Sequence, residues 1–161
     1  MNNEKFTFFW HTESPFSNWH PAEFVVNDIH YNCTEQYMMH QKAVLFDDKE
    51  TAERILQVDS PKAQKALGRK VRNFDKDTWE ANCKQILYDG NRAKFTQNEG
   101  LLSTLLATAG TTLVEASPVD RIWGIGLSAA DPKAQSRDTW RGKNWLGEVL
   151  TRLREDLIDK K

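Results

Sequence analysis

The sequence contains only two cysteines, Cys33 and Cys83, among its 161 residues. Two thiols cannot build the framework of several disulfides that stabilises small secreted domains, and these two lack the paired spacing of zinc ligands. A Gly-rich phosphate loop, a nucleophile elbow and a zinc-binding motif are also missing from the sequence. We therefore expect reduced thiols, and neither a metal nor a cofactor.

The sequence also has no excess of charge and no long apolar run. Its net charge is -1 and its pI is near 6.4, which gives no electrostatic basis for a nucleic-acid or acidic-membrane surface. The first residues lack the apolar run of a signal peptide. The most apolar later stretch, residues 101–109, is too short to span a bilayer. We expect a cytoplasmic protein with no membrane partner.

The hydrophobic pattern predicts a mainly helical α+β fold. A chain of 161 residues is long enough for one domain with its own core, so we expect a single domain over residues 1–161. Aromatic and β-branched runs predict a few strands, and apolar residues at helical spacing predict the remaining elements. The expected strands are 6–10, 111–116 and a hairpin over 23–31 with its turn at Asn27-Asp28. The expected helices are 34–46, 49–58, 61–68 (begun by Ser60-Pro61), 74–95 (interrupted at Gly90), 98–109 and 144–157, and residues 128–142 are expected to be irregular.

The helix expected at residues 34–46 combines core-forming and charged side chains on one face. Thr34 is a suitable N-cap, and Glu35 falls in the first turn, where the helix dipole favours a carboxylate. At 3.6 residues per turn, Glu35, Met38 and Lys42 share one face. Charge among core residues is costly unless it is paired or used, so this face is a candidate site. The alternative is an exposed helix that happens to carry both charges.

Four short segments give the sequence a resemblance to a known family. They are 16–18 (Phe-Ser-Asn), 34–42 (Thr-Glu-Gln-Tyr onward to the lysine), 120–127 (Asp-Arg-Ile-Trp-Gly-Ile-Gly-Leu) and 142–147 (Gly-Lys-Asn-Trp-Leu-Gly). In this order and spacing, they make the chain closely similar to the YbiA-type branch of the NADAR family, the riboflavin biosynthesis intermediates N-glycosidases. The resemblance spans most of the chain and implies a YbiA-like fold.

The resemblance implies a metal-independent N-glycosidase. Its substrates would be ribosylaminopyrimidine phosphates of early riboflavin biosynthesis, cleaved at the ribose C–N bond to ribose 5-phosphate and an aminopyrimidine. An alternative is hydrolysis of ADP-ribosylated guanine, which would make a modified base the only nucleic-acid partner. A third possibility is a non-catalytic ribonucleotide-binding module. The oligomeric state is left open.

Three residues in the matching motifs are candidates for catalysis. Glu35 and Asp120 can form the pair of carboxyl groups that glycoside chemistry commonly uses. Lys42 has two possible roles: as a charged ammonium it would hold a phosphate, and as a neutral amine it would form a Schiff base with the opened sugar. Asp120 has a structural alternative, as a turn residue that bonds its own backbone.

Ten further residues are candidates for binding the substrate. Aromatic rings would stack on a flat base, arginines would hold a phosphate, glycines would admit the ligand closely, and amides at the start of the last helix would bind an anion. Each also has a structural alternative, since tryptophans are commonly core residues and arginines commonly face solvent. The candidates are Ser17, Asn18, Tyr37, Arg69, Arg72, Trp79, Trp123, Gly124, Gly126 and Asn144.

Overall fold

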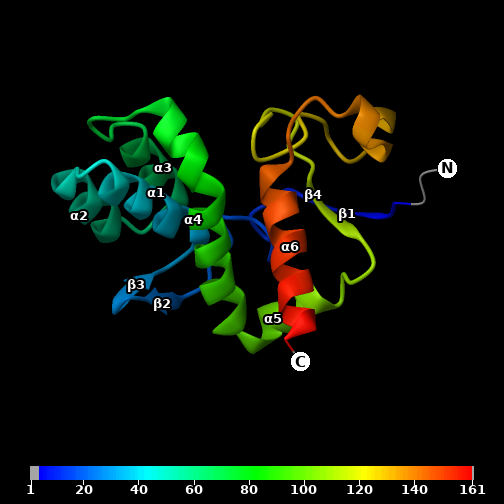
Figure 1. Cartoon of the computed structure of the whole chain (residues 1–161), viewed down its shortest axis with the longest axis horizontal. Helices are drawn as coiled ribbons and strands as arrows, with labels where there is room; N and C mark the ends of the chain where they lie inside the picture. The colour runs from blue at the N-terminus through cyan, green and yellow to red at the C-terminus, as the bar shows by residue number, and fades with distance from the viewer. Residues whose placement is uncertain (1–3, 161) are drawn as a thin grey trace. The chain divides into compact units, whose positions relative to one another are not determined.

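The computed structural model describes residues 4–160 as a predominantly helical protein with a few short strands (Figure 1). The predicted α+β class is confirmed. The single domain predicted over 1–161 also includes residues 1–3 and 161, which lie outside the described residues. In chain order the elements are β1 (Phe6–Phe9), β2 (Phe24–Val26), β3 (Ile29–Tyr31), α1 (Thr34–Leu45), α2 (Lys49–Gln57), α3 (Pro61–Gly68), α4 (Lys76–Thr96), α5 (Glu99–Leu106), β4 (Thr112–Glu115), η1 (Pro132–Gln135), η2 (Arg137–Thr139) and α6 (Trp145–Asp159).

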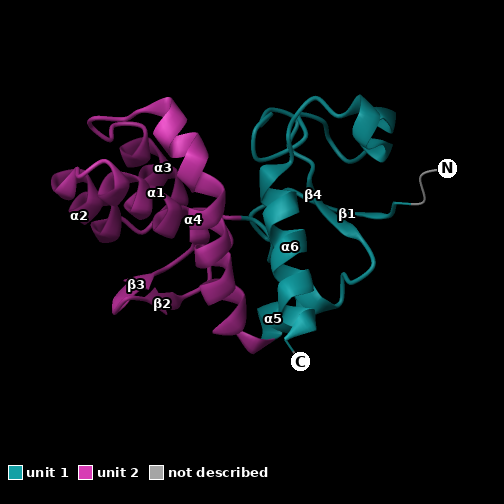
Figure 2. Ribbon diagram, viewed as in Figure 1, with its two compact units in different colours: residues 1–17, 100–161 teal, residues 18–99 magenta. Residues whose placement is uncertain are grey.

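The chain divides into two compact units, which Figure 2 colours separately. Among the described residues, unit 1 comprises 4–17 and 100–160, and unit 2 comprises 18–99. That the whole chain acts as one domain stays a prediction.

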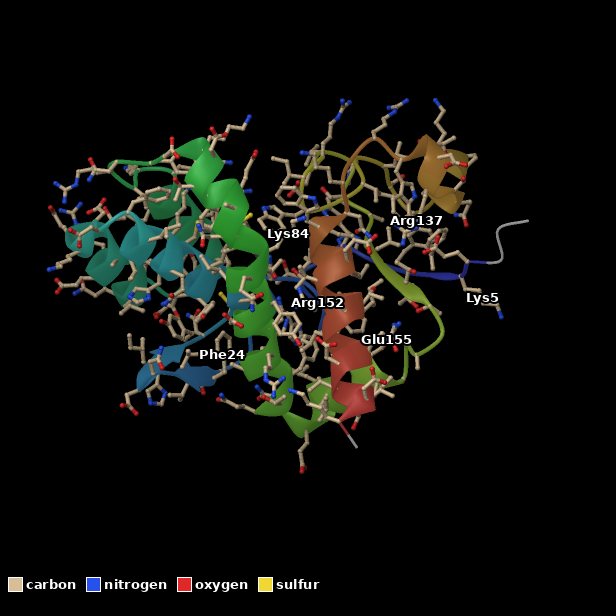
Figure 3. All side chains as sticks on the ribbon, in the orientation of Figure 1. Lys5, Phe24, Lys84, Arg137, Arg152 and Glu155 are labelled. Carbon is tan, nitrogen blue, oxygen red and sulfur yellow. The ribbon has the colours of Figure 1, made fainter. Side chains whose placement is uncertain are left out.

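Unit 2 begins with the predicted hairpin. β2 and β3 are antiparallel, with Phe24 opposite Tyr31. Asn27 and Asp28 connect the strands with φ angles of 51° and 66°, as the tight hairpin turn requires. The buried rings of Phe24 and Tyr31 stack with centroids 5.6 Å apart, and Tyr37 of α1 packs against both rings. Figure 3 labels Phe24 on β2.

The helices of unit 2 pack around α1, which contacts α2, α3 and α4. Polar side chains fix where three of these helices begin. Asp48, Ser60 and Asp75 each accept a hydrogen bond from a first-turn backbone N–H of α2, α3 and α4, respectively. Pro61 follows Ser60 at the first helical position, as predicted.

The predicted interruption of the long helix near Gly90 is wrong, because α4 continues without a break from Lys76 to Thr96. Gly90 is buried, and a Cβ atom at this position would collide with the ring of Tyr37. The glycine therefore lets α4 approach α1 closely.

Unit 1 contains a parallel pair of strands covered by α6. β1 pairs with β4, Phe6 lying opposite Thr112, and α6 packs on β4. The core on these strands consists of Val114, Ile125, Leu127 and Ala134, with Phe6, Phe8 and Trp140 packed against it. Residues 128–142, expected to be irregular, contain the two short 3-10 helices η1 and η2.

Arg137, labelled in Figure 3, links three segments of unit 1. From η2, its guanidinium donates to both carboxylate oxygens of Glu4 at 2.6–2.7 Å, and to Glu148 of α6 at 2.6 Å. These bonds connect the irregular segment to β1 and α6. No helix within residues 4–160 combines the length and apolar character needed to cross a membrane.

Asp48 of unit 2 is a buried carboxylate that serves several partners. It accepts the N–H and hydroxyl of Thr51 at 3.2 and 2.7 Å. It also accepts the backbone N–H and the guanidinium of Arg72, both at 2.9 Å. The bond from the Arg72 guanidinium is the largest of several that hold the pKa of Asp48 far below its usual range. Asp48 thus joins the start of α2 to the segment that precedes α4.

We predict that Asp48→Asn lowers the melting temperature at pH 7 by a few degrees, roughly the effect of losing an N-cap in a chain of this size. Because folding depresses the pKa of Asp48, its stabilisation is fully present above the unfolded value, near 3.9, and is lost as pH falls toward the folded value. The melting temperatures of the two proteins should therefore begin to approach each other as the pH falls below about 4.

Asp75→Asn is the comparison variant: the Asp75 side chain also caps a helix, but among the described residues it bonds Thr78 and no arginine, so its loss should have the smaller pH dependence. A difference between wild type and Asp48→Asn that is constant from pH 7 to pH 3 would contradict the proposed charge effect.

Candidate functional site

The start of α1 is fixed by a backbone contact rather than by the predicted cap. Cys33, not Thr34, is the N-cap residue, and no side chain caps the helix. The backbone N–H of Glu35 donates instead to the carbonyl of Asn18 at 2.9 Å. The hydroxyl of Thr34 is buried and has no hydrogen-bond partner among the described residues. The loop at Asn18 therefore sets where Glu35 lies.

Glu35 is a buried carboxylate, with only 5% of its surface exposed. Its Oε1 accepts a hydrogen bond from the indole N–H of Trp19 at 2.9 Å. Trp19 is not among the residues predicted to form the site, although it directly follows the matching segment 16–18. A carboxylate held in this way can stabilise nearby positive charge or take part in proton transfer.

Lys42 lies two turns further along α1, in an aromatic environment. Its Nζ is 4.7 Å from the ring centroid of Phe74 and 5.5 Å from that of Trp79. Burial is the largest effect on this amine and lowers its pKa; Arg69 lowers it further, and Glu35 acts in the opposite direction. Lys42 thus has an environment that favours the neutral amine through burial and the charged form through the rings and Glu35.

Phe74 is a neighbour of Lys42 that was not predicted from the sequence. Its ring is 46% exposed, although it packs edge-on against Phe46 with centroids 5.4 Å apart. Phe74 directly precedes Asp75, the cap of α4, and no periodic pattern in the sequence marks it as a neighbour of Lys42.

The two arginines predicted to bind phosphate have different environments. Arg72 is paired with Asp48 at 2.9 Å and lies 3.7 Å from Glu50. Arg69 follows the last turn of α3, is exposed, and is close enough to Lys42 to affect its pKa. Arg69 is therefore the better placed of the two to bind an anion beside Lys42.

Tyr37 lies in the core of unit 2 and not on its surface. Its ring packs edge-on against Tyr31, and burial raises the pKa of its hydroxyl to about 12. This packing gives the ring of Tyr37 a structural role in the core. Trp79, by contrast, is only partly buried beside Lys42.

In unit 1, Asp120 shapes a tight turn. Its Oδ1 accepts the backbone N–H groups of Ile122 and Trp123, both at 2.9 Å, while its own N–H donates to the hydroxyl of Ser117. This is the geometry of the structural alternative. The catalytic role of Asp120 stays a prediction.

Asn144 is completely buried and adopts a left-handed backbone conformation, with φ of 54°. Its side chain accepts from the N–H of Glu115 and donates to the carbonyl of Leu113, both at 3.0 Å, so it binds the edge of β4.

The first amides of α6 are also occupied. The N–H groups of residues 144, 145 and 146 donate to the carbonyls of Gly124, Ile122 and Trp123, at 3.1 Å each. Binding of a phosphate by these three amides would require the loop to release them.

The loop that closes the start of α6 contains the remaining candidates. Trp123 is partly buried and packs edge-on against Trp145, with centroids 5.7 Å apart. Gly126 has a φ of 71°, which favours glycine, and a Cβ on Gly124 would press on the carbonyl of Glu115. Both glycines thus have a structural reason to be present.

Ser17 and Asn18 are buried where one unit ends and the other begins. The backbone N–H of Ser17 donates to the carbonyl of Ser14 at 3.1 Å. The side-chain oxygen of Asn18 is buried and has no hydrogen-bond partner within residues 4–160. Asn18 therefore has unused hydrogen-bonding capacity beside Glu35.

The candidates fall into two groups. Unit 2 brings together Asn18, Glu35, Lys42, Arg69 and Trp79, with Trp19 and Phe74 added by the structure. The group of unit 1 consists of Asp120, Trp123, Gly124, Gly126 and Asn144. The predicted pairing of Glu35 with Asp120 is divided between the units and stays a prediction. Residues 4–160 contain no cluster of three His, Cys, Asp or Glu side chains suited to a metal ion.

Comparison with known proteins identifies similar sequences and a similar structure. The model of the NADAR domain matches residues 8–158. N-glycosidase R617 of Acanthamoeba polyphaga mimivirus is 40% identical, over 97% of this chain and 98% of the viral protein. Protein irg-1 of Caenorhabditis elegans is 39% identical, over 94% of this chain and 79% of the worm protein.

The bacterial relative N-glycosidase YbiA of Escherichia coli is 34% identical, over 91% of this chain and 82% of its own. The NMR structure of E. coli YbiA matches this fold with a TM-score of 0.80 and 31% identity, covering 99% of this chain and 89% of that one. Two of these three relatives are named N-glycosidases, in agreement with the activity predicted from sequence.

We predict that Asn144→Asp destabilises the fold by about 3 kcal/mol, because it places a carboxylate oxygen against the carbonyl of Leu113 in a buried position. Chemical denaturation measures the loss. Asn82→Asp is the control: Asn82 is exposed on α4, and its substitution should change stability by less than about 0.5 kcal/mol. Unchanged stability of Asn144→Asp would show that the contacts with β4 are unimportant.

Proposed function

The chain belongs to the NADAR domain family, and from that premise we propose that it is a hydrolase that cleaves an N-glycosyl bond of a ribosylated small molecule. The observation that carries the proposal is the pair formed by Glu35 and Lys42 on α1. Glu35 is a carboxylate that is only 5% exposed, and Lys42 is an amine whose pKa is lowered by burial. A buried carboxylate near an amine with a perturbed pKa is typical of active sites.

The reaction suits these two groups. Cleavage of a ribose C–N bond leaves positive charge on C1 and the ring oxygen, which a nearby carboxylate stabilises. A ribosylamine can also open to an imine, and a neutral Lys42 would then attack C1. The aminopyrimidine leaves with the electron pair of the C–N bond and a proton, and water hydrolyses the lysine imine to release the sugar.

We further propose a ribosylaminopyrimidine phosphate of early riboflavin biosynthesis as the substrate. Trp79, beside Lys42, offers a ring for the pyrimidine. Arg69 is exposed near the same lysine and suits the phosphate. That Trp123 of unit 1 stacks on the base stays a prediction from the sequence.

The test is to incubate the purified protein, in the presence of EDTA, with the riboflavin intermediate and separately with ADP-ribosylated guanosine. Mass spectrometry follows the released sugar phosphate and base. Turnover of the riboflavin intermediate supports the proposal, and turnover of the guanosine adduct alone assigns the alternative substrate. Binding of either compound without turnover would identify a binding module and refute the enzyme.

Replacing the buried carboxylate should abolish activity while leaving the fold intact. We expect Glu35→Gln to lower kcat by about 100-fold or more, because the neutral amide cannot stabilise positive charge or transfer a proton. Circular dichroism and thermal unfolding check the fold. Glu53→Gln, on the exposed face of α2, is the control and should keep full activity. Near-normal turnover by Glu35→Gln would exclude a catalytic role for Glu35.

The covalent role of Lys42 predicts a trapped intermediate. Borohydride added during turnover should reduce the imine and attach the sugar phosphate to Lys42, as detected by peptide mass. Because the neutral amine attacks, the rate should rise with pH through the lowered pKa of Lys42. Lys42→Arg should lose about 100-fold or more, since arginine cannot form the imine.

The matched control is Lys62→Arg, at an exposed position of α3. Absence of an adduct, together with substantial activity of Lys42→Arg, would make Lys42 an electrostatic anchor for the phosphate.

A further inference from the structure

The loop before β2 holds Glu35 at two points. The carbonyl of Asn18 accepts the backbone N–H of Glu35 at 2.9 Å. The next residue, Trp19, donates its indole N–H to the carboxylate, also at 2.9 Å. Two adjacent residues therefore fix both the backbone and one carboxylate oxygen of Glu35. This arrangement restricts the rotation of the carboxylate.

The indole N–H also restricts the chemistry of Glu35. An indole nitrogen can only donate, so it pairs best with a carboxylate oxygen that carries negative charge. Burial opposes that charge, and a donor is needed to offset the cost.

Other ionisable groups of unit 2 lie near Glu35 and its neighbours. Lys42 on α1 interacts with Glu35 as an opposite charge. The neighbouring Cys33 is buried, which raises the pKa of its thiol to about 11, so it stays neutral. On α4, Lys94 is fully buried beside Cys33, and burial lowers the pKa of this amine to about 7. Arg69 of α3 adds a further cation near Lys42.

We propose that Trp19 is a positioning residue that keeps Glu35 ionised and oriented, so that Glu35 acts as the anion facing the positively charged ribose and not as the proton donor. The inference rests on the proposed function and assigns a role that the sequence left open. In the reaction, the electron pair of the C–N bond leaves with the nitrogen. Water adds its oxygen to C1, and a proton from that water ends on the departing nitrogen.

The first test needs no substrate. In ¹⁵N-labelled protein, the indole N–H resonance of Trp19, assigned through its own backbone, should shift with pH as Glu35 gains or loses its proton. The same resonance should not titrate in Glu35→Gln. A Trp19 indole resonance that has the same position at neutral pH in wild type and in Glu35→Gln, or that titrates equally in both, would overturn the proposal. Because wild-type protein supplies the measurement, it does not depend on whether a Trp19 variant folds.

The second test compares Trp19→Phe with Trp10→Phe. Trp10 is a partly exposed tryptophan whose ring packs on His11, outside the group around Glu35. Loss of the indole donor should lower kcat about tenfold, the effect of one hydrogen bond to a charged group, with little change in KM. It should also move the acidic limb of the pH–rate profile to higher pH, because the carboxylate form has lost a donor.

Trp10→Phe should keep the wild-type profile. An acidic limb that stays in place in Trp19→Phe, with an equal loss of rate at every pH, would refute the role in ionisation. Failure of the proposed function is recognised separately: the wild-type protein would then release no sugar from either substrate, while the indole titration would still report on the contact between Trp19 and Glu35.

Discussion

The burial of α1 is the constraint on which the structure of unit 2 depends. α2, α3 and α4 all pack against this helix, so most of its side chains are removed from water although several are polar. Each buried polar group then needs a partner. Gln36 bonds the N–H of Asn32 and the carbonyl of Ile55, and His40 bonds the hydroxyl of Tyr31. Glu35 has two hydrogen-bond partners in the loop before β2.

The elements of the fold could be predicted from sequence because their signals are local. Ser60 with Pro61, and Asn27 with Asp28, mark a helix start and a hairpin turn through their own backbone preferences. The uninterrupted α4 could not be predicted in this way. The space that Gly90 leaves is filled by Tyr37, and only the packed structure shows that the glycine serves a helix contact.

The candidate site was only partly predicted, because only some of its residues have a local signal in the sequence. Glu35 and Lys42 could be selected because helical spacing places them on one face. Trp19 and Phe74 could not, since hydrogen bonds and ring contacts between distant segments have no periodic signal. Asn144 is a residue that was predicted to bind the ligand but has a structural role. Its position in a motif indicates ligand binding, whereas its side chain bonds the edge of β4. A sequence motif therefore marks important positions, but it does not show whether a residue is needed to bind the ligand or to stabilise the fold.

The cap of α2 has a consequence for a distant part of unit 2. Asp48 fixes both the backbone and the side chain of Arg72, and Asn73 then turns the chain through a left-handed conformation, with φ of 62°. The next residue is Phe74, whose ring lies over Lys42. The surroundings of the amine are therefore set by a carboxylate at the start of another helix. Substitutions that do not contact the ligand can therefore change the environment of Lys42. Inactivating substitutions should accordingly occur around Asp48 as well, although this residue caps a helix and does not bind the ligand.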